Sequence, residues 1–172
     1  MAPDGVGRDR VDQARADHDR LAARARALFV ARLAFVLVGA APFALTLLAK
    51  TLPAGALREL VKLPFALVCH QRLERTLELA GAPMPVCSRC AGIFAGLALG
   101  AVALWPRLSL RAARLALFGA GAAMALDVAL QDLGLHPLWH ATRLATGFAL
   151  GGLGAAALFS AIRREAVTTQ PA

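Results

Sequence analysis

The sequence contains no tyrosine, and only 6% of its residues are aromatic and 17% charged. Surfaces that bind nucleic acid interleave aromatic and basic side chains, so this shortage argues against nucleic acid as a partner despite a net charge of +8. The remainder is apolar: 58% of the residues are hydrophobic and the mean hydropathy is +0.59. Soluble domains are about 45–50% apolar. The composition therefore predicts a single-domain integral membrane protein whose main partner is the lipid bilayer.

Long apolar runs predict an all-α membrane protein, because about 20 apolar residues allow a helix to cross a bilayer. We expect one transmembrane domain over residues 27–162. A charged N-terminal tail, residues 1–26, is expected to be a short helix or disordered, and a short tail follows at 163–172. The four predicted spans cover about 27–49, 88–105, 112–131 and 142–162.

The segment between the first two predicted spans differs from them. Residues 50–68 place apolar side chains at helical spacing with charged residues opposite, a pattern typical of an amphipathic helix lying at the membrane surface. Residues 70–86 are expected to form a polar helix-turn segment that Pro83 and Pro85 stiffen. The chain would then return to the membrane at the second span.

Glycines recur at every fourth position in two of the predicted spans. The second span contains Gly92, Gly96 and Gly100, and the fourth contains Gly147 and Gly151. In lipid this small-xxx-small spacing marks helix faces that pack closely. We interpret these glycines as packing residues.

Basic residues in the short loops predict the orientation. The loop at 106–114 has three arginines and no acidic residue, whereas the loop at 132–141 has neither lysine nor arginine. Cytoplasmic loops are enriched in lysine and arginine, so both termini are expected in the cytoplasm, with the protein in the cell (inner) membrane. The segment 50–86, which has more basic than acidic residues, is counter-evidence because this orientation places it outside.

Cysteine is scarce, and all three copies lie in one short stretch together with a histidine. Thiolate sulfur and imidazole nitrogen are ligands that borderline-soft metals prefer. We therefore predict a metal site, with zinc as the expected cofactor, formed by Cys69, His70, Cys87 and Cys90. An odd number of cysteines cannot all pair in intrachain disulfides.

In the predicted topology the cysteine segment lies on the extracytoplasmic side of the membrane. Further polar residues are expected in the same layer. Asp127 and Gln131 are four residues apart, hence on one helix face, near the outer end of the third span. Arg143 begins the fourth span, and His136 and His140 lie in the loop before it. A polar layer at membrane depth is costly and therefore suggests a functional site.

Four motifs share this layer: Cys69-His70-Gln71-x-x-x-Arg75, Pro85-x-Cys87-x-Arg89-Cys90-x-Gly92, Asp127-x-x-x-Gln131 and Arg143-x-x-Thr146-Gly147. In order and spacing they resemble a family of small prokaryotic membrane proteins known as domain of unknown function 2085. The resemblance covers about residues 64–155. It implies that these residues belong to one site, and it implies no activity.

The polar residues allow more than one role. Asp127 is expected either to form a salt bridge with Arg143 or Arg89 or to act as a general base or metal ligand. Together with Gln131 and Arg143 it forms the candidate catalytic group. Arg75 and Arg89, with other arginines nearby, are candidates for binding an anion.

Three functions fit this sequence. The first is a metal-dependent site that acts on an anionic lipid or small molecule, in which a zinc-activated water would be the nucleophile. The second is a thiol-disulfide or quinone-linked redox protein that uses Cys87 and Cys90, whose thiol pKa values a helix start would lower. The third is a non-enzymatic scaffold or carrier in which the metal only fixes a loop.

Overall fold

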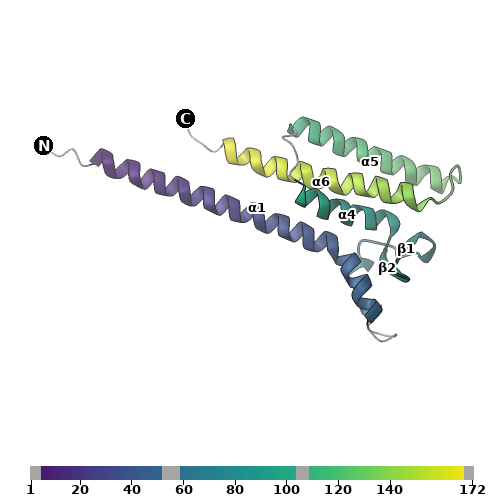
Figure 1. The fold of residues 1–172 in the computed structure, drawn as a ribbon. Coiled ribbons are helices and arrows are strands. Elements are labelled where there is room, and N and C mark those ends of the chain that lie inside the picture. The colour runs from purple at the N-terminus through teal and green to yellow at the C-terminus, as the bar shows by residue number, and fades with distance from the viewer. Residues whose placement is uncertain (1–4, 52–58, 104–108, 169–172) are drawn as a thin grey trace.

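The computed structural model describes residues 5–51, 59–103 and 109–168. Most of these residues are helical, and the remaining regular structure is a short hairpin (Figure 1). In chain order the elements are α1 (Gly5–Thr51), α3 (Leu63–Ala66), the 3-10 turn η1 (Leu73–Arg75), β1 (Thr76–Leu79), β2 (Ala82–Cys87), α4 (Ser88–Val102), α5 (Leu110–Asp132) and α6 (His140–Thr168).

Three of these helices, α1, α5 and α6, are long and apolar enough to cross a membrane. The fourth predicted span corresponds to α6, whereas the second corresponds to α4, which has only 15 residues. At 1.5 Å per residue, α4 is about 22 Å long, shorter than a hydrocarbon core of about 30 Å. The described chain is mostly helical, as expected, and has three candidate membrane-spanning helices, but it does not confirm the count of four spans.

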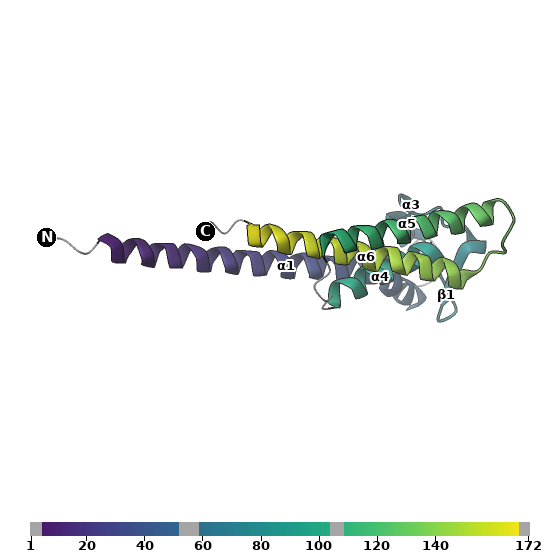
Figure 2. The same cartoon turned by 90° about the horizontal axis from the view of Figure 1, so that it is seen from above.

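Helix α1 is one continuous helix of 47 residues, about 70 Å long at the usual rise. It includes most of the charged N-terminal segment, which is therefore helical and continuous with the first predicted span. Its start projects beyond the end of α6 in both views (Figures 1 and 2). Toward its C-terminal end α1 bends, in the part that contains Pro42, because proline removes a helical hydrogen bond and clashes with the preceding turn.

The polar segment before α4 is a β-hairpin, so the predicted helix-turn at 70–86 was wrong. Strands β1 and β2 pair antiparallel, and Leu79 faces Ala82 across a two-residue turn. Both turn residues have positive φ, 54° at Ala80 and 77° at Gly81, as a type I′ turn requires. The prolines of β2 are tolerated because the sheet has only two strands, which leaves the backbone groups on one side of β2 outside the ladder.

The segment before the hairpin contains α3, which has four residues. Residues 52–58 lie outside the described chain, and so does part of the predicted surface helix at 50–68, which stays a prediction. The end of α1 is tied to the hairpin turn, because Lys50 Nζ donates a hydrogen bond to the carbonyl oxygen of Ala80 (2.8 Å). Buried Phe65, Met84 and Val86 pack between the hairpin, α1 and α4.

Helices α4 and α6 pack directly through glycines, as the sequence pattern predicts. A Cβ atom at Gly92 or Gly96 would collide with the α6 backbone at Leu144 or Phe148. Conversely, a Cβ atom at Gly147 would collide with the carbonyl oxygen of Arg89 on α4. Small residues on both helices therefore allow the two backbones to touch. Both helices begin at the hairpin end of the bundle (Figure 1).

Candidate functional site

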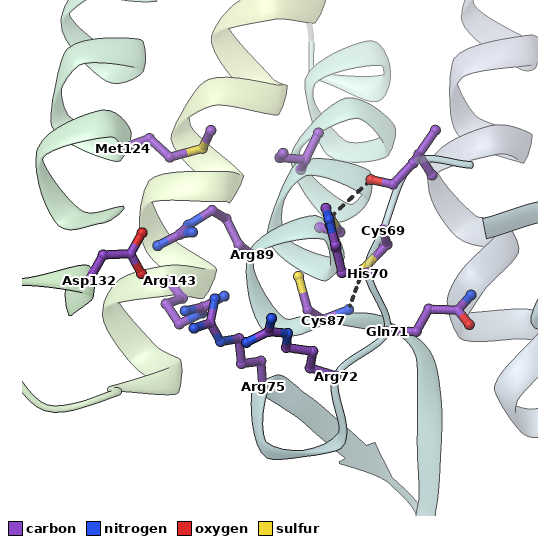
Figure 3. Close-up of a pocket in the computed structure, with 13 residues that line it drawn as sticks. Cys69, His70, Gln71, Arg72, Arg75, Cys87, Arg89, Met124, Asp132 and Arg143 are labelled. Carbon is purple, nitrogen blue, oxygen red and sulfur yellow. Dashed lines mark hydrogen bonds between the residues drawn. The ribbon is translucent and has the colours of Figure 1, made fainter. Parts of the chain in front are cut away.

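The hairpin brings the three cysteines together. Cys69 follows α3, Cys87 ends β2 and is the N-cap of α4, and Cys90 lies in the first turn of α4. Their three sulfur atoms lie within 4.8 Å of one another. Cys69 is buried, whereas Cys87 and Cys90 are half-buried, and all three line one cavity (Figure 3).

Local hydrogen bonds polarise the sulfur atoms. The backbone N–H of Cys87 donates to Cys69 Sγ at 3.2 Å. Hydrogen bonds from the thiols of Cys69 and Cys90 lower the pKa of Cys87, and backbone N–H groups of the first turn of α4 add to this effect. The thiolate is the form of cysteine that binds metals and attacks electrophiles. The hydrogen bonds with Cys69 and Cys87, together with burial, raise the pKa of Cys90, so the expectation of a lowered pKa holds for Cys87 and not for Cys90. The arrangement thus favours a thiolate at Cys87.

His70 lines the same cavity, but it is not part of the three-sulfur group. Its side chain is exposed, and the next residue, Gln71, has a positive φ of 50°. The amide of Gln71 donates to the carbonyl oxygen of Lys62 at 2.7 Å, which fixes this turn. The structure therefore brings together three of the four predicted metal ligands and leaves His70 beside them.

The cavity that the cysteines line has a volume of about 510 Å³. Four arginines line it as well, and Figure 3 shows Arg72, Arg75 and Arg143 close together near Cys87, with Arg89 apart from them. They come from separate elements: Arg72 and Arg75 precede the hairpin, Arg89 belongs to α4 and Arg143 to α6. The cavity therefore combines a thiol cluster with a strongly cationic wall.

A chain of polar contacts joins α4, α5 and α6 at this cavity. Arg89 donates to Asp127 Oδ2 at 2.5 Å, and Gln131 donates to Asp127 Oδ1 at 2.9 Å. Arg143 Nη1 donates to Gln131 Oε1 at 2.7 Å, and Arg143 Nε donates to Ser88 Oγ at 3.2 Å. Of the two salt bridges expected for Asp127, the structure forms the one with Arg89 and reaches Arg143 only through Gln131.

The arginines differ in their partners. The side chains of Arg89 and Asp127 are 12% and 10% exposed, so their ion pair is largely but not fully shielded from solvent. Arg143 is only 2% exposed and bonds to neutral groups. Within the described residues, no carboxylate oxygen lies within 4.0 Å of the guanidinium nitrogens of Arg72, Arg75 or Arg143. Three cations without an ion-pair partner at that distance therefore face one cavity, which Asp132 also lines.

The other predicted residues of this layer lie outside the cavity wall. His136 stacks against Trp139, with ring centroids 4.6 Å apart, and His140 begins α6. Three residues of the site were not predicted from the sequence. Ser88 is buried and hydrogen-bonded to Arg143. Met124 and Asp132 line the cavity. Met124 could have been predicted from the helical spacing, because it lies one turn before Asp127 on the same face of the helix.

A family model described as "Predicted membrane protein (DUF2085)" matches residues 69–158, about half of the chain. This protein belongs to the DUF2085 family. The match confirms the resemblance read from the four motifs, and it covers the cysteines, the hairpin and the polar contacts between helices. Helix α1 lies outside the matched DUF2085 region. No curated protein and no solved structure matches the chain at a significant level.

Proposed function

We propose that this membrane protein binds zinc through Cys69, Cys87 and Cys90 and uses the adjoining cavity to bind an anionic lipid or small molecule. The observation that supports this most directly is that three sulfur atoms within 4.8 Å share a cavity with four arginines. Soft thiolate ligands favour zinc among the common metals. Three protein ligands leave one tetrahedral position open, as catalytic zinc sites do.

The charges of the site support a zinc ion at the cysteines next to an anion held by the arginines. A zinc ion with three thiolates has a net charge of minus one, which would repel an anion from the open position. The guanidinium groups of Arg72, Arg75 and Arg143 offset that charge, because no carboxylate in the described chain neutralises them. When bound, the zinc would act as a Lewis acid or activate a water molecule. His70 is near enough in sequence to close the fourth position when no ligand is present.

Within this proposal Asp127 and Gln131 are positioning residues. Asp127 holds Arg89 and receives a bond from Gln131, and Gln131 holds Arg143. Arg143 and Arg75 would contact the anion. In this proposal Asp127 orients the arginines, and its catalytic role stays an untested expectation.

We place the site outside the cytoplasm, with both termini inside and the protein in the inner membrane. Two features support this: the loop at 132–141 has no basic residue, and the cysteines lie at the opposite end of the bundle from the start of α1 and the end of α6 (Figure 1).

Metal content tests the proposal. Protein made without a histidine tag should contain one zinc per chain by elemental analysis, and Cys87→Ser and Cys90→Ser should abolish it because each removes a thiolate. Cys69→Ser should abolish it for the same reason, whereas His70→Ala should at most weaken it because His70 is not part of the three-sulfur group. His18→Ala, an exposed residue of α1, is the control and should retain the metal. Equal zinc in wild type and Cys87→Ser would refute the metal site.

A redox function is the second candidate, and the position of Cys87 favours it. Cys87 and Cys90 flank the first turn of α4, and the pKa of Cys87 is lowered. Oxidation would form a Cys87–Cys90 disulfide and pass two electrons and two protons to an acceptor such as a quinone. A wild-type protein without metal but with one reducible disulfide and one free thiol would establish this function instead.

A further inference from the structure

We propose that the ligand of this cavity is an amphiphile with a phosphate head. Arg72, Arg75 and Arg143 would hold the phosphate, and Ile93 and Met124 would contact the start of its apolar chain. This deepens the proposed anionic ligand by naming its chemistry and depends on that part of the proposed function, but the phosphate site does not itself require the zinc.

The head site is built around Arg143. Its side chain is 2% exposed, and its hydrogen bonds go to Ser88 and Gln131, which are neutral. A buried cation without a counterion is strongly unfavourable, so an anion in the cavity would complete the site. Arg75 adds a second incomplete group, because its buried Nε has no hydrogen-bond partner in the described chain.

Two helix starts strengthen the preference for an anion. Helices α4 and α6 both begin at this end of the bundle (Figure 1), and a helix N-terminus carries a partial positive charge. Arg143 lies in the first turn of α6, where a cation is disfavoured unless an anion accompanies it. Phosphate fits better than a carboxylate because its several oxygens match several guanidinium forks at once.

The opposite wall of the cavity is apolar. Ile93 lies one turn beyond Arg89 along α4, and Met124 lies one turn before Asp127 along α5. Both therefore lie on the bundle side of the Arg89–Asp127 ion pair, away from the hairpin. Figure 3 shows Met124 at the far side of Arg89 from Arg72 and Arg75. The cavity thus runs from a cationic end to an apolar end.

The size of the cavity agrees with this polarity. Its volume of about 510 Å³ lies within the range of about 300–1,000 Å³ typical of small-molecule sites and leaves much more room than a phosphate group needs. A ligand with an apolar chain would fill the remainder against Ile93 and Met124. A free phosphate ion would leave that wall uncovered.

Lipid binding to the full chain tests the proposal. Purified protein in dodecyl maltoside micelles, which contain no phosphate, would be titrated with dioleoyl phosphatidic acid, with inorganic phosphate and oleate as competitors. We expect phosphatidic acid to bind and both competitors to displace it poorly. Arg75→Gln should weaken its binding about tenfold or more, because a hydrogen bond to a charged group is lost. Arg75→Lys should restore only part of it because lysine lacks the bidentate fork.

Matched variants separate the two ends of the cavity. Arg111→Gln removes the same charge from an exposed position in the first turn of α5 and should change nothing. Met124→Gln should weaken phosphatidic acid binding without changing that of inorganic phosphate. The buried Nε of Arg75 has no hydrogen-bond partner in the described chain, whereas Arg143 bonds to Ser88 and Gln131, so Arg75→Gln should fold even if Arg143→Gln does not.

Several outcomes would overturn the proposal. Unchanged phosphatidic acid binding in Arg75→Gln would remove the arginine site, and inorganic phosphate binding as tightly as the lipid would make the ligand a free oxyanion. Equal displacement by oleate would remove the phosphate preference. Zinc measured in the same samples separates the two hypotheses: zinc without lipid binding refutes only this inference, and lipid binding without zinc refutes only the metal site.

Discussion

The largely shielded ion pair between Arg89 and Asp127 gives a quantitative test of how the helices are held together. Removing either partner leaves the other charge uncompensated, because the two side chains are only 12% and 10% exposed. We predict that Arg89→Met and Asp127→Leu are each strongly destabilising, and that the double variant is less so than the sum of the two.

The expected magnitude follows from the contacts. Breaking a buried pair by removing one partner costs about 3–5 kcal/mol, whereas replacing both by apolar groups is often nearly neutral. In the double variant Gln131 Nε2 still loses its acceptor on Asp127, which adds about 1–3 kcal/mol. The singles should thus sum to about 6–10 kcal/mol and the double should cost about 1–3, a coupling of at least about 3 kcal/mol.

Unfolding in mixed detergent micelles, measured for wild type, both singles and the double, gives this coupling. A control cycle pairs Arg89→Met with Glu78→Leu, since Glu78 is exposed on β1, does not line the cavity and forms no ion pair in the described chain. Its coupling should be near zero. If the Arg89–Asp127 cycle were additive within about 0.5 kcal/mol, the pair would not hold α4 to α5.

Three further predictions concern packing and orientation. Gly96→Ala should destabilise the protein by about 1–3 kcal/mol because its Cβ would meet the α6 backbone, whereas Gly119→Ala, in open space, should be tolerated; thermal unfolding in detergent compares them. Gly81→Ala should loosen the hairpin by about 1–2 kcal/mol because Gly81 has a positive φ, which faster zinc loss to a chelator would reveal. An impermeant thiol reagent should label Cys87 or Cys90 in intact, reduced, metal-stripped cells; labelling only after the inner membrane is opened would reverse the orientation.

Short-range spacing predicted part of this structure well. Asp127 and Gln131 were placed on one helix face because they are four residues apart, and their side chains are hydrogen-bonded at 2.9 Å. The glycines of the second and fourth predicted spans were read as packing residues, and they do contact each other's helices. Both predictions depend only on helical geometry. Once a segment is recognised as a helix, the spacing of its residues tells which of them share a face.

Contacts between segments that are distant in the sequence could not be predicted from residue spacing. The sequence allowed Asp127 to pair with Arg89 or Arg143, and only the three-dimensional position of α4 beside α5 selects Arg89. The hairpin was missed because its strands are short and β2 contains two prolines, although Gly81 between Leu79 and Ala82 is a turn signal. His70 lies outside the sulfur group and is followed by a turn at Gln71. The positive φ of Gln71 could not be predicted from the sequence pattern.

The glycine packing and the polar site are parts of one arrangement. Because Gly147 has no side chain, α6 lies directly against the carbonyl oxygen of Arg89 on α4. Arg143 is one turn earlier on α6 and therefore comes beside Ser88, the residue before Arg89. The contact that brings the two helix backbones together thus also sets which cations face the cavity. A larger residue at Gly147 would separate the helices and, with them, the two arginines that the cavity receives from α4 and α6.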